Sequence, residues 1–117
     1  MRILLAHNNY SVTGGAEVFY HEIGRLLELN GHQVSWFSCA ENDLEAPYSN
    51  YFPRVSRYDS GGFLDKACRV HSVIYNRNAR TEMARLIKDF NPDLIHCFAI
   101  YGRLTPAILD AATAASV

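Results

Sequence analysis

An uninterrupted apolar run, Ile3 to Ala6, lies at the very start of the chain, and a polar loop with two glycines follows it from His7 to Gly15. Such a run before a glycine-bearing loop is typical of a strand that is buried on both faces, as strands are in parallel sheets. Parallel neighbours need a helical crossover between them. This start therefore predicts an alternating α/β fold.

The segment after the loop predicts the first crossover helix and the second strand. Asn30-Gly31 ends the helix, because glycine accepts the left-handed conformation found at helix C-termini. Val34, Trp36 and Phe37 then predict a strand. The apolar residues at helical spacing are expected to form the buried face of this helix: Ala16, Phe19, Ile23, Leu26 and Leu27.

The middle of the chain predicts a long loop and then two helices. Residues 41–61 carry prolines and asparagines and favour a loop with at most one short strand, near Tyr51 to Tyr58. Residues 63–90 show a helical period, which the cluster Asn76-Arg77-Asn78 divides in two. The apolar positions of the second helix are Ala79, Met83, Leu86, Ile87 and Phe90.

The last quarter of the chain predicts one more strand and one more helix. Asn91-Pro92 stops the preceding helix, and Asp93 to Phe98 is the expected strand. A helix then begins near Thr105-Pro106, with Thr105 as its cap, and runs to Ala115. The order of elements predicts a Rossmann-like three-layer α/β/α fold with a mostly parallel sheet. Residues 1–117 are expected to form a single partial domain, because an alternating chain would next supply another strand.

Composition excludes several classes of protein. Eleven Lys and Arg stand against 12 Asp and Glu, so the formal net charge of −1 gives no electrostatic support to nucleic-acid binding. Three cysteines without a CxxC pair suit a reducing compartment, and no signal peptide is visible, so a cytoplasmic location is expected. No run is long enough to span a membrane, which leaves peripheral membrane contact open.

The loop from His7 to Gly15 is the first candidate binding site. It joins a central strand to the start of a helix, which is where open α/β sheets bind ligands. Gly14 and Gly15 allow close backbone approach, and free helix amides favour an anion such as a diphosphate. Two alternatives stay open. The glycines either bind the anion or serve only the turn, and Glu17 is either a ligand contact or a capping residue.

Several motifs together resemble one known family. Gly-Gly-Ala-Glu opens the first helix, Gly-His-Gln-Val leads into the second strand, and Asn-Pro-Asp-Leu-Ile-His precedes a loop that contains Thr-Pro. Their order and spacing resemble the N-terminal part of GT-B fold glycosyltransferases of family 4, also called group 1. The resemblance covers nearly the whole chain except residues 41–75.

The resemblance implies a transferase that moves a sugar from a nucleotide sugar to a carbohydrate or lipid-linked acceptor. In this family the N-terminal domain binds the acceptor, and a C-terminal domain, which has no counterpart here, holds most of the donor. Gly14 and Gly15 would lie near the donor diphosphate. The residues implied on the acceptor side of the cleft are Asn9, Tyr10, His96 and Tyr101, with Glu17 beside them. No catalytic residue is assigned, and this chain alone is expected to be inactive.

Metal and cofactor chemistry find little support. Cys68 and His71 share a helical face, but two ligands do not complete a zinc site, and neighbouring His96 and Cys97 face opposite sides of a strand. Neither a metal nor a cofactor is expected. The alternative function is a non-catalytic, flavodoxin-like or receiver-like binding module, although a receiver needs acidic residues where His7, Asn8 and Asn9 stand. A dehydrogenase or epimerase would need a GxGxxG motif, which is absent.

The strand from Asp93 to Phe98 is expected to lie at an edge of the sheet. It is apolar at Leu94, Ile95, Cys97 and Phe98 and carries no Lys or internal Pro that would discourage pairing. The sequence therefore predicts self-association through this strand.

Overall fold

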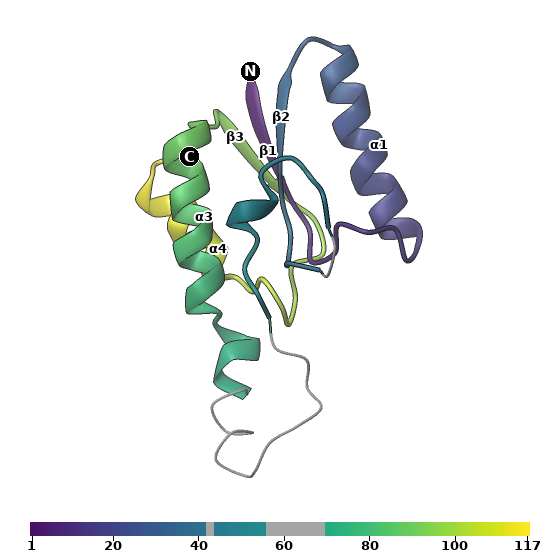
Figure 1. The fold of residues 1–117 in the computed structure, drawn as a ribbon. Coiled ribbons are helices and arrows are strands. Elements are labelled where there is room, and N and C mark those ends of the chain that lie inside the picture. Colours follow the sequence, from purple (N-terminus) through teal and green to yellow (C-terminus); the bar gives the residue numbers. More distant parts are fainter. Residues whose placement is uncertain (42–43, 56–69) are drawn as a thin grey trace.

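The computed structural model describes residues 1–41, 44–55 and 70–117. Within these residues three parallel strands form one sheet in the order β2-β1-β3: β1 (Arg2–Ala6), β2 (Gln33–Phe37) and β3 (Leu94–Cys97) (Figure 1). Leu5 pairs with Trp36 on one side and with His96 on the other. Residues 3–6 are at most 4% exposed. The predicted parallel sheet, with its first strand buried on both faces, is confirmed.

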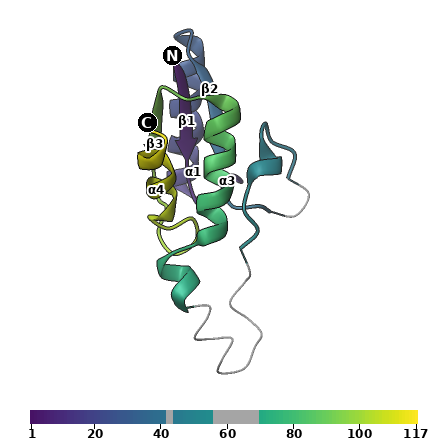
Figure 2. The ribbon, with the colours of Figure 1, turned by 90° about the vertical axis from the view of Figure 1, so that its left-hand side faces the viewer.

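Helices cover both faces of this sheet, which confirms the Rossmann-like α/β/α layers. One face carries α1 (Gly15–Leu29), and the opposite face carries α3 (Arg77–Phe90) and α4 (Ala107–Ala114), which lie side by side (Figure 1, Figure 2). Successive β1 residues point to opposite layers. Leu4 and Ala6 pack with α3 and α4, whereas Ile3 and Leu5 pack beneath α1 with Tyr20.

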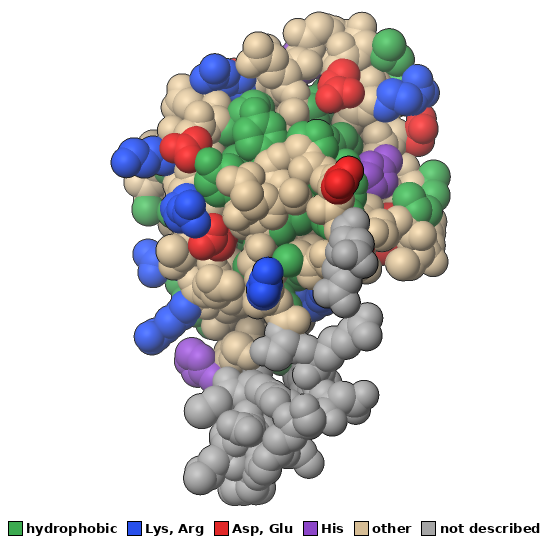
Figure 3. All heavy atoms as spheres, in the orientation of Figure 1, with side chains coloured by type: hydrophobic (Ala, Val, Ile, Leu, Met, Phe, Trp, Pro, Cys, Tyr) green, Lys and Arg blue, Asp and Glu red, His purple; other side chains and the backbone are tan. Residues whose placement is uncertain are grey.

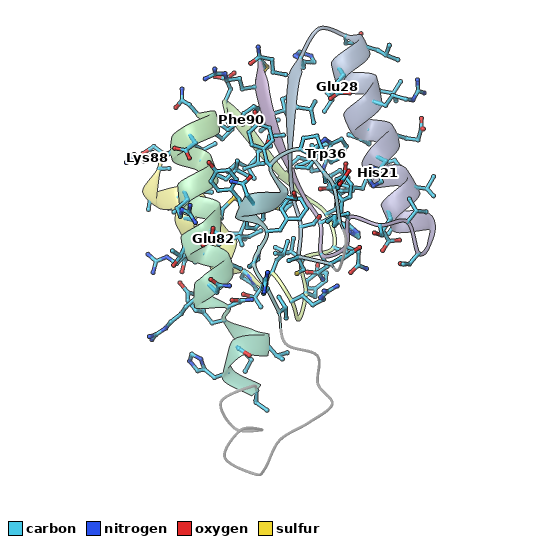
Figure 4. The ribbon with its side chains drawn as sticks, in the orientation of Figure 1. His21, Glu28, Trp36, Glu82, Lys88 and Phe90 are labelled. Carbon is cyan, nitrogen blue, oxygen red and sulfur yellow. The ribbon has the colours of Figure 1, made fainter. Side chains whose placement is uncertain are left out.

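The helix α3 follows its sequence pattern closely. The Asn76 side chain caps its start by accepting from the Ala79 N–H at 3.0 Å, and Asn91 ends it in the left-handed conformation just before Pro92. Its buried residues are the five predicted ones: Ala79, Met83, Leu86, Ile87 and Phe90. Its Lys and Arg side chains stand along the outer side of the molecule (Figure 3), and Lys88 points away from the sheet (Figure 4).

The predicted buried face of α1 is wrong in part, although Ile23 and Leu27 do pack against the core beneath the helix. The buried residues of this helix are Glu17, Tyr20 and Gly24, whereas Phe19 is 57% exposed and Leu26 is 46% exposed. Ala16 is also exposed, and Ile23 and Leu27 are half-buried.

The cause of this rotation is the indole ring of Trp36, which lies beneath the helix at Gly24. A Cβ atom on Gly24 would come within 2.0 Å of a ring carbon of Trp36. Trp36 and His21 lie beside each other between β2 and α1, with ring centroids 5.2 Å apart (Figure 4). The helix therefore turns Gly24, rather than Phe19 or Leu26, toward the sheet.

The long loop agrees with its prediction in the part that the structure describes. Residues 44–55 contain the 3-10 turn η1 (Ser49–Tyr51) and no strand, and Pro53 O accepts from the Ala40 N–H at 2.9 Å. Residues 56–58 of the expected strand lie outside the described residues. The predicted division of the 63–90 region is confirmed from residue 70 on: residues 70–74 are helical, Tyr75 and Asn76 are not, and α3 follows.

The start of α4 lies one residue later than predicted. Pro106 is the capping residue, and Thr105 precedes it with a positive φ of 63°. The Thr105 hydroxyl still accepts from the Ala107 N–H, at 3.3 Å. The helix then buries its small and aliphatic residues against α3: Ala107, Ile108, Ala111 and Ala112.

In the part of the chain that the structure describes, every helix is too short or too polar to cross a membrane.

Candidate functional site

The loops after all three strands meet at the carboxyl edge of the sheet, and Asn8 joins them. Its backbone N–H donates to Ala99 O at 2.9 Å, and its carbonyl accepts from the Cys39 N–H at 3.2 Å. Its side-chain amide donates to Tyr101 O at 2.7 Å and accepts from the Leu104 N–H at 3.0 Å. One asparagine thus fixes the relative positions of the loops that follow β1, β2 and β3.

Asn9 extends this network across the sheet. Its Nδ2 donates to Glu17 Oε1 at 3.0 Å, and its Oδ1 accepts from an Arg103 N–H. The amide therefore has one defined orientation, between a carboxylate at the start of α1 and a guanidinium from the loop after β3. A side-chain amide held by two charged groups is an ordered donor and acceptor at the edge where ligands bind.

Glu17 is the charged residue at the start of α1. It is only 6% exposed, and its carboxyl pKa is lowered, first by the hydrogen bond from Asn9 and then by its own backbone N–H. Thr13 contributes a further hydrogen bond to the same carboxylate. The carboxylate is therefore ionised at neutral pH and stabilises the positive end of the helix dipole.

Gly14 and Gly15 form the turn into α1. Gly14 has an extended backbone, which any residue adopts, and a Cβ on it would lie at ordinary contact distance, 3.4 Å, from Glu17 Oε2. A Cβ on Gly15 would meet no described atom within 4 Å. Packing among the described residues therefore does not require either glycine, and the backbone of this turn is open.

His7 supports the network from beneath. It is 2% exposed, its Nδ1 lies 2.8 Å from Asn9 O, and its ring lies 5.2 Å from the ring of Tyr20. Its Nε2 has no hydrogen-bond partner among the described residues. His7 therefore fixes the main chain of Asn9 from inside the core.

The other predicted site residues are spread over this edge. The Tyr10 ring packs against His21 and Trp36, its N–H bonds Glu41, and burial raises the pKa of its hydroxyl. The side chain of Tyr10 is thus part of the packing beneath α1.

His96 and Tyr101 are both open to solvent. The ring of His96 stacks on Phe98 at 4.3 Å on the α1 side of the sheet, while Cys97 packs on the opposite side, as predicted. Tyr101 is 81% exposed, and its carbonyl holds the Asn8 side chain. Asn9 and Glu17 are therefore in direct contact, whereas the side chains of His96 and Tyr101 form no hydrogen bond with other described residues.

Sequence reasoning missed Arg103 and the turn that carries it. Asn76, the cap of α3, also donates to Arg103 O at 2.8 Å, and its N–H donates to the Thr105 hydroxyl at 2.9 Å. Gly102 and Thr105 both have positive φ, 73° and 63°. The one available signal was that Arg103 follows a predicted strand. The hydrogen bonds that position its side chain and its turn join residues far apart in the sequence, so no spacing pattern reveals them.

The cysteines and histidines form no metal centre in residues 1–41, 44–55 and 70–117, where no three His, Cys, Asp or Glu side chains gather around a common point. Cys68, one of the two zinc ligands considered, lies outside these residues. Burial raises the pKa of the Cys39 thiol to about 11, although the nearby Arg103 guanidinium opposes this shift. Cys39 is therefore a protonated, unreactive thiol at neutral pH.

An open parallel sheet with crossover helices on both faces and an ordered polar network at its carboxyl edge defines a Rossmann-like α/β domain. A family model described as Glycosyltransferase Family 4 matches residues 13–113. The chain belongs to this family. Neither a curated protein nor a solved structure matches it significantly.

Proposed function

We propose that this chain is the N-terminal, acceptor-side domain of a GT-B glycosyltransferase that moves a sugar from a nucleotide sugar to a carbohydrate or lipid-linked acceptor. The family match carries the reaction type. The network of Asn8, Asn9 and Glu17 supports the location of the site, since it lies at the edge where such sheets bind ligands. A separate C-terminal domain supplies most of the donor site.

The proposed roles follow the positions of the residues. The open backbone at Gly14 and Gly15 receives the donor diphosphate, which the helix amides stabilise as it leaves. Asn9, Glu17, His96 and Tyr101 line the acceptor side, and Tyr10 supports that wall through its packing. The donor is a substrate, and we assign no metal or organic cofactor. The free thiols of Cys39 and Cys97 suit the reducing cytoplasm, where we place the protein.

The experiment that tests this function compares residues 1–117 with the full-length gene product. Both are incubated with a panel of nucleotide sugars and candidate acceptors, and release of nucleoside diphosphate is followed. We expect turnover from the full-length protein and none above buffer background from this chain, because donor recognition needs the second domain. Turnover by residues 1–117 alone, or none by the full-length protein with any donor, would contradict the proposal.

We also propose that the isolated chain self-associates through β3. Among the described residues no strand pairs with the outer edge of β3, and Leu94 on this strand is 47% exposed. Ile95 faces the packed layer of α3 and α4, so lysine at that position would also disturb the core. Leu94→Lys is the better probe, with Leu29→Lys on the exposed end of α1 as its control.

Light scattering over a concentration series measures this association. The unchanged chain and Leu29→Lys are expected to approach the mass of a dimer as concentration rises, and Leu94→Lys is expected to remain monomeric. A monomeric mass for the unchanged chain at the highest concentration would reject pairing through this strand.

A further inference from the structure

We propose that Arg103 is an oxyanion-binding residue that receives a phosphate or carboxylate group carried by the acceptor. The assignment of the oxyanion to an acceptor rests on the proposed function. The binding of an oxyanion by Arg103 rests on the structure of the described residues alone.

The location of Arg103 is the first argument. In the strand order β2-β1-β3, the chain adds β2 on one side of β1 and later adds β3 on the other side. The direction in which the chain winds through the sheet therefore reverses between β1 and β3. Open parallel sheets bind their ligands in the crevice at this reversal, outside the carboxyl ends of the strands. Asn9 follows β1 and Arg103 follows β3, and their hydrogen bond spans that crevice.

The unused hydrogen-bonding capacity of Arg103 is the second argument. A guanidinium has five N–H donors, and in the part of the chain that the structure describes only Asn9 Oδ1 accepts from them. The two ion pairs among the described residues, Arg25 with Glu22 and Arg85 with Glu82, leave Arg103 without a carboxylate. The side chain is half-buried, so it reaches solvent. A planar fork of free donors matches two oxygens of a phosphate or carboxylate.

The third argument is that the turn fixes the position of Arg103. Thr105 is a buried, β-branched residue with a positive φ, a conformation that such residues avoid. Asn76 holds the turn in this conformation by binding both Arg103 O and the Thr105 hydroxyl through its own polar groups. Strained conformations that their surroundings enforce are concentrated at binding and active sites. The guanidinium is therefore presented in one place before a ligand arrives.

The fourth argument separates this oxyanion from the donor diphosphate. The Asn9 amide lies between Glu17 and Arg103, so the two charged groups occupy opposite ends of one hydrogen-bonded chain. The ionised Glu17 carboxylate stands at the glycine turn, where a Cβ on Gly14 would touch it. An oxyanion on the acceptor is favoured at the Arg103 end of this chain, where the nearest charge is positive.

The test is an NMR titration of the 117-residue chain with four probes: inorganic phosphate, a hexose 6-phosphate, a hexuronate and a neutral hexose. We compare the unchanged chain with Arg103→Gln, which removes the charge and the guanidinium fork and keeps a polar side chain. Arg77→Gln, an exposed arginine at the start of α3, is the charge-matched control. Thermal melting of each variant reports whether it is folded.

The Arg103 side-chain N–H resonance of the unchanged chain is expected to shift with at least one oxyanion. Arg103→Gln is expected to bind that probe at least 10-fold more weakly, as the loss of a charged hydrogen-bond donor implies, and Arg77→Gln equally well. Binding of the phosphates alone, or of the hexuronate alone, identifies the group and supports the proposal. An unshifted Arg103 resonance, or equal weakening by Arg77→Gln, overturns it.

The titration and the transfer assay fail independently. Oxyanion binding through Arg103 with an inactive full-length protein would leave the inference in place and remove the proposed function. An active full-length protein without oxyanion binding in the chain would do the reverse.

Discussion

Gly24→Ala is expected to lower the free energy of unfolding by about 3 kcal/mol, the upper end of the usual cost of overpacking a core. In an exposed helix the same change would stabilise, because alanine is the better helix former. Here the new Cβ would lie 2.0 Å from a ring carbon of Trp36, which is itself only 7% exposed. Neither the ring nor the helix can move without opening the layer between β2 and α1. Urea denaturation measures the change.

Gly15→Ala is the matched control for this experiment. It also places an alanine in α1, but its Cβ meets open space, so the stability should be unchanged or slightly higher. Trp36→Leu removes the ring, and Gly24→Ala should cost much less in that background than in the unchanged chain. If Gly24→Ala costs the same with and without the indole, the close contact is not what holds the helix in place.

Gly15→Val in the full-length protein is expected to lower the rate of sugar transfer by about 10²–10³, the usual effect of losing one transition-state donor. A β-branched side chain at this position would cover the backbone amides that we propose for the diphosphate. The melting temperature should change little, because no described atom lies within 4 Å of the added Cβ. Steady-state kinetics and thermal melting of the same preparation separate the two effects.

The size series at this position sharpens the result. Gly15→Ala should lose less activity than Gly15→Val, since a single methyl group blocks less of the turn. A sharp fall in melting temperature, with normal turnover by the protein that remains folded, would show that the glycine serves only the turn.

The sheet was predictable because each strand carries its own signal. Ile3 to Ala6 is apolar without interruption, and each of the other two strands is a short apolar segment between turn residues. The helix α3 was predictable for the same reason, since its apolar residues form a single stripe and the rest of its surface is polar.

The orientation of α1 could not be predicted in this way. Its sequence has apolar residues on several faces, including Val18, Phe19 and Leu26, so spacing alone does not choose between them. The choice depends on the fit between Gly24 and Trp36, which lie on different elements. Because glycine has no side chain, the spacing of apolar residues does not mark Gly24 as a buried position of the helix.

The candidate site was also predictable only in its local part. The loop from His7 to Gly15 was predicted because it is local: a strand, two glycines and the start of a helix. Arg103 was not, since it meets Asn9 from a position 94 residues further along the chain, and its place after a predicted strand does not show that contact. The orientation of Tyr10 also depends on distant residues, because its ring packs against the rings of Trp36 and Phe52.

Asn76 couples the start of α3 to the turn that carries Arg103. Its side-chain oxygen caps α3 by accepting from the Ala79 N–H, and its side-chain NH2 group donates to Arg103 O in the turn. Fraying of the first turn of the helix therefore releases the turn as well, so the two form one unit of local opening. A ligand that immobilises Arg103 would slow hydrogen exchange at the start of α3, on the opposite side of the sheet from α1.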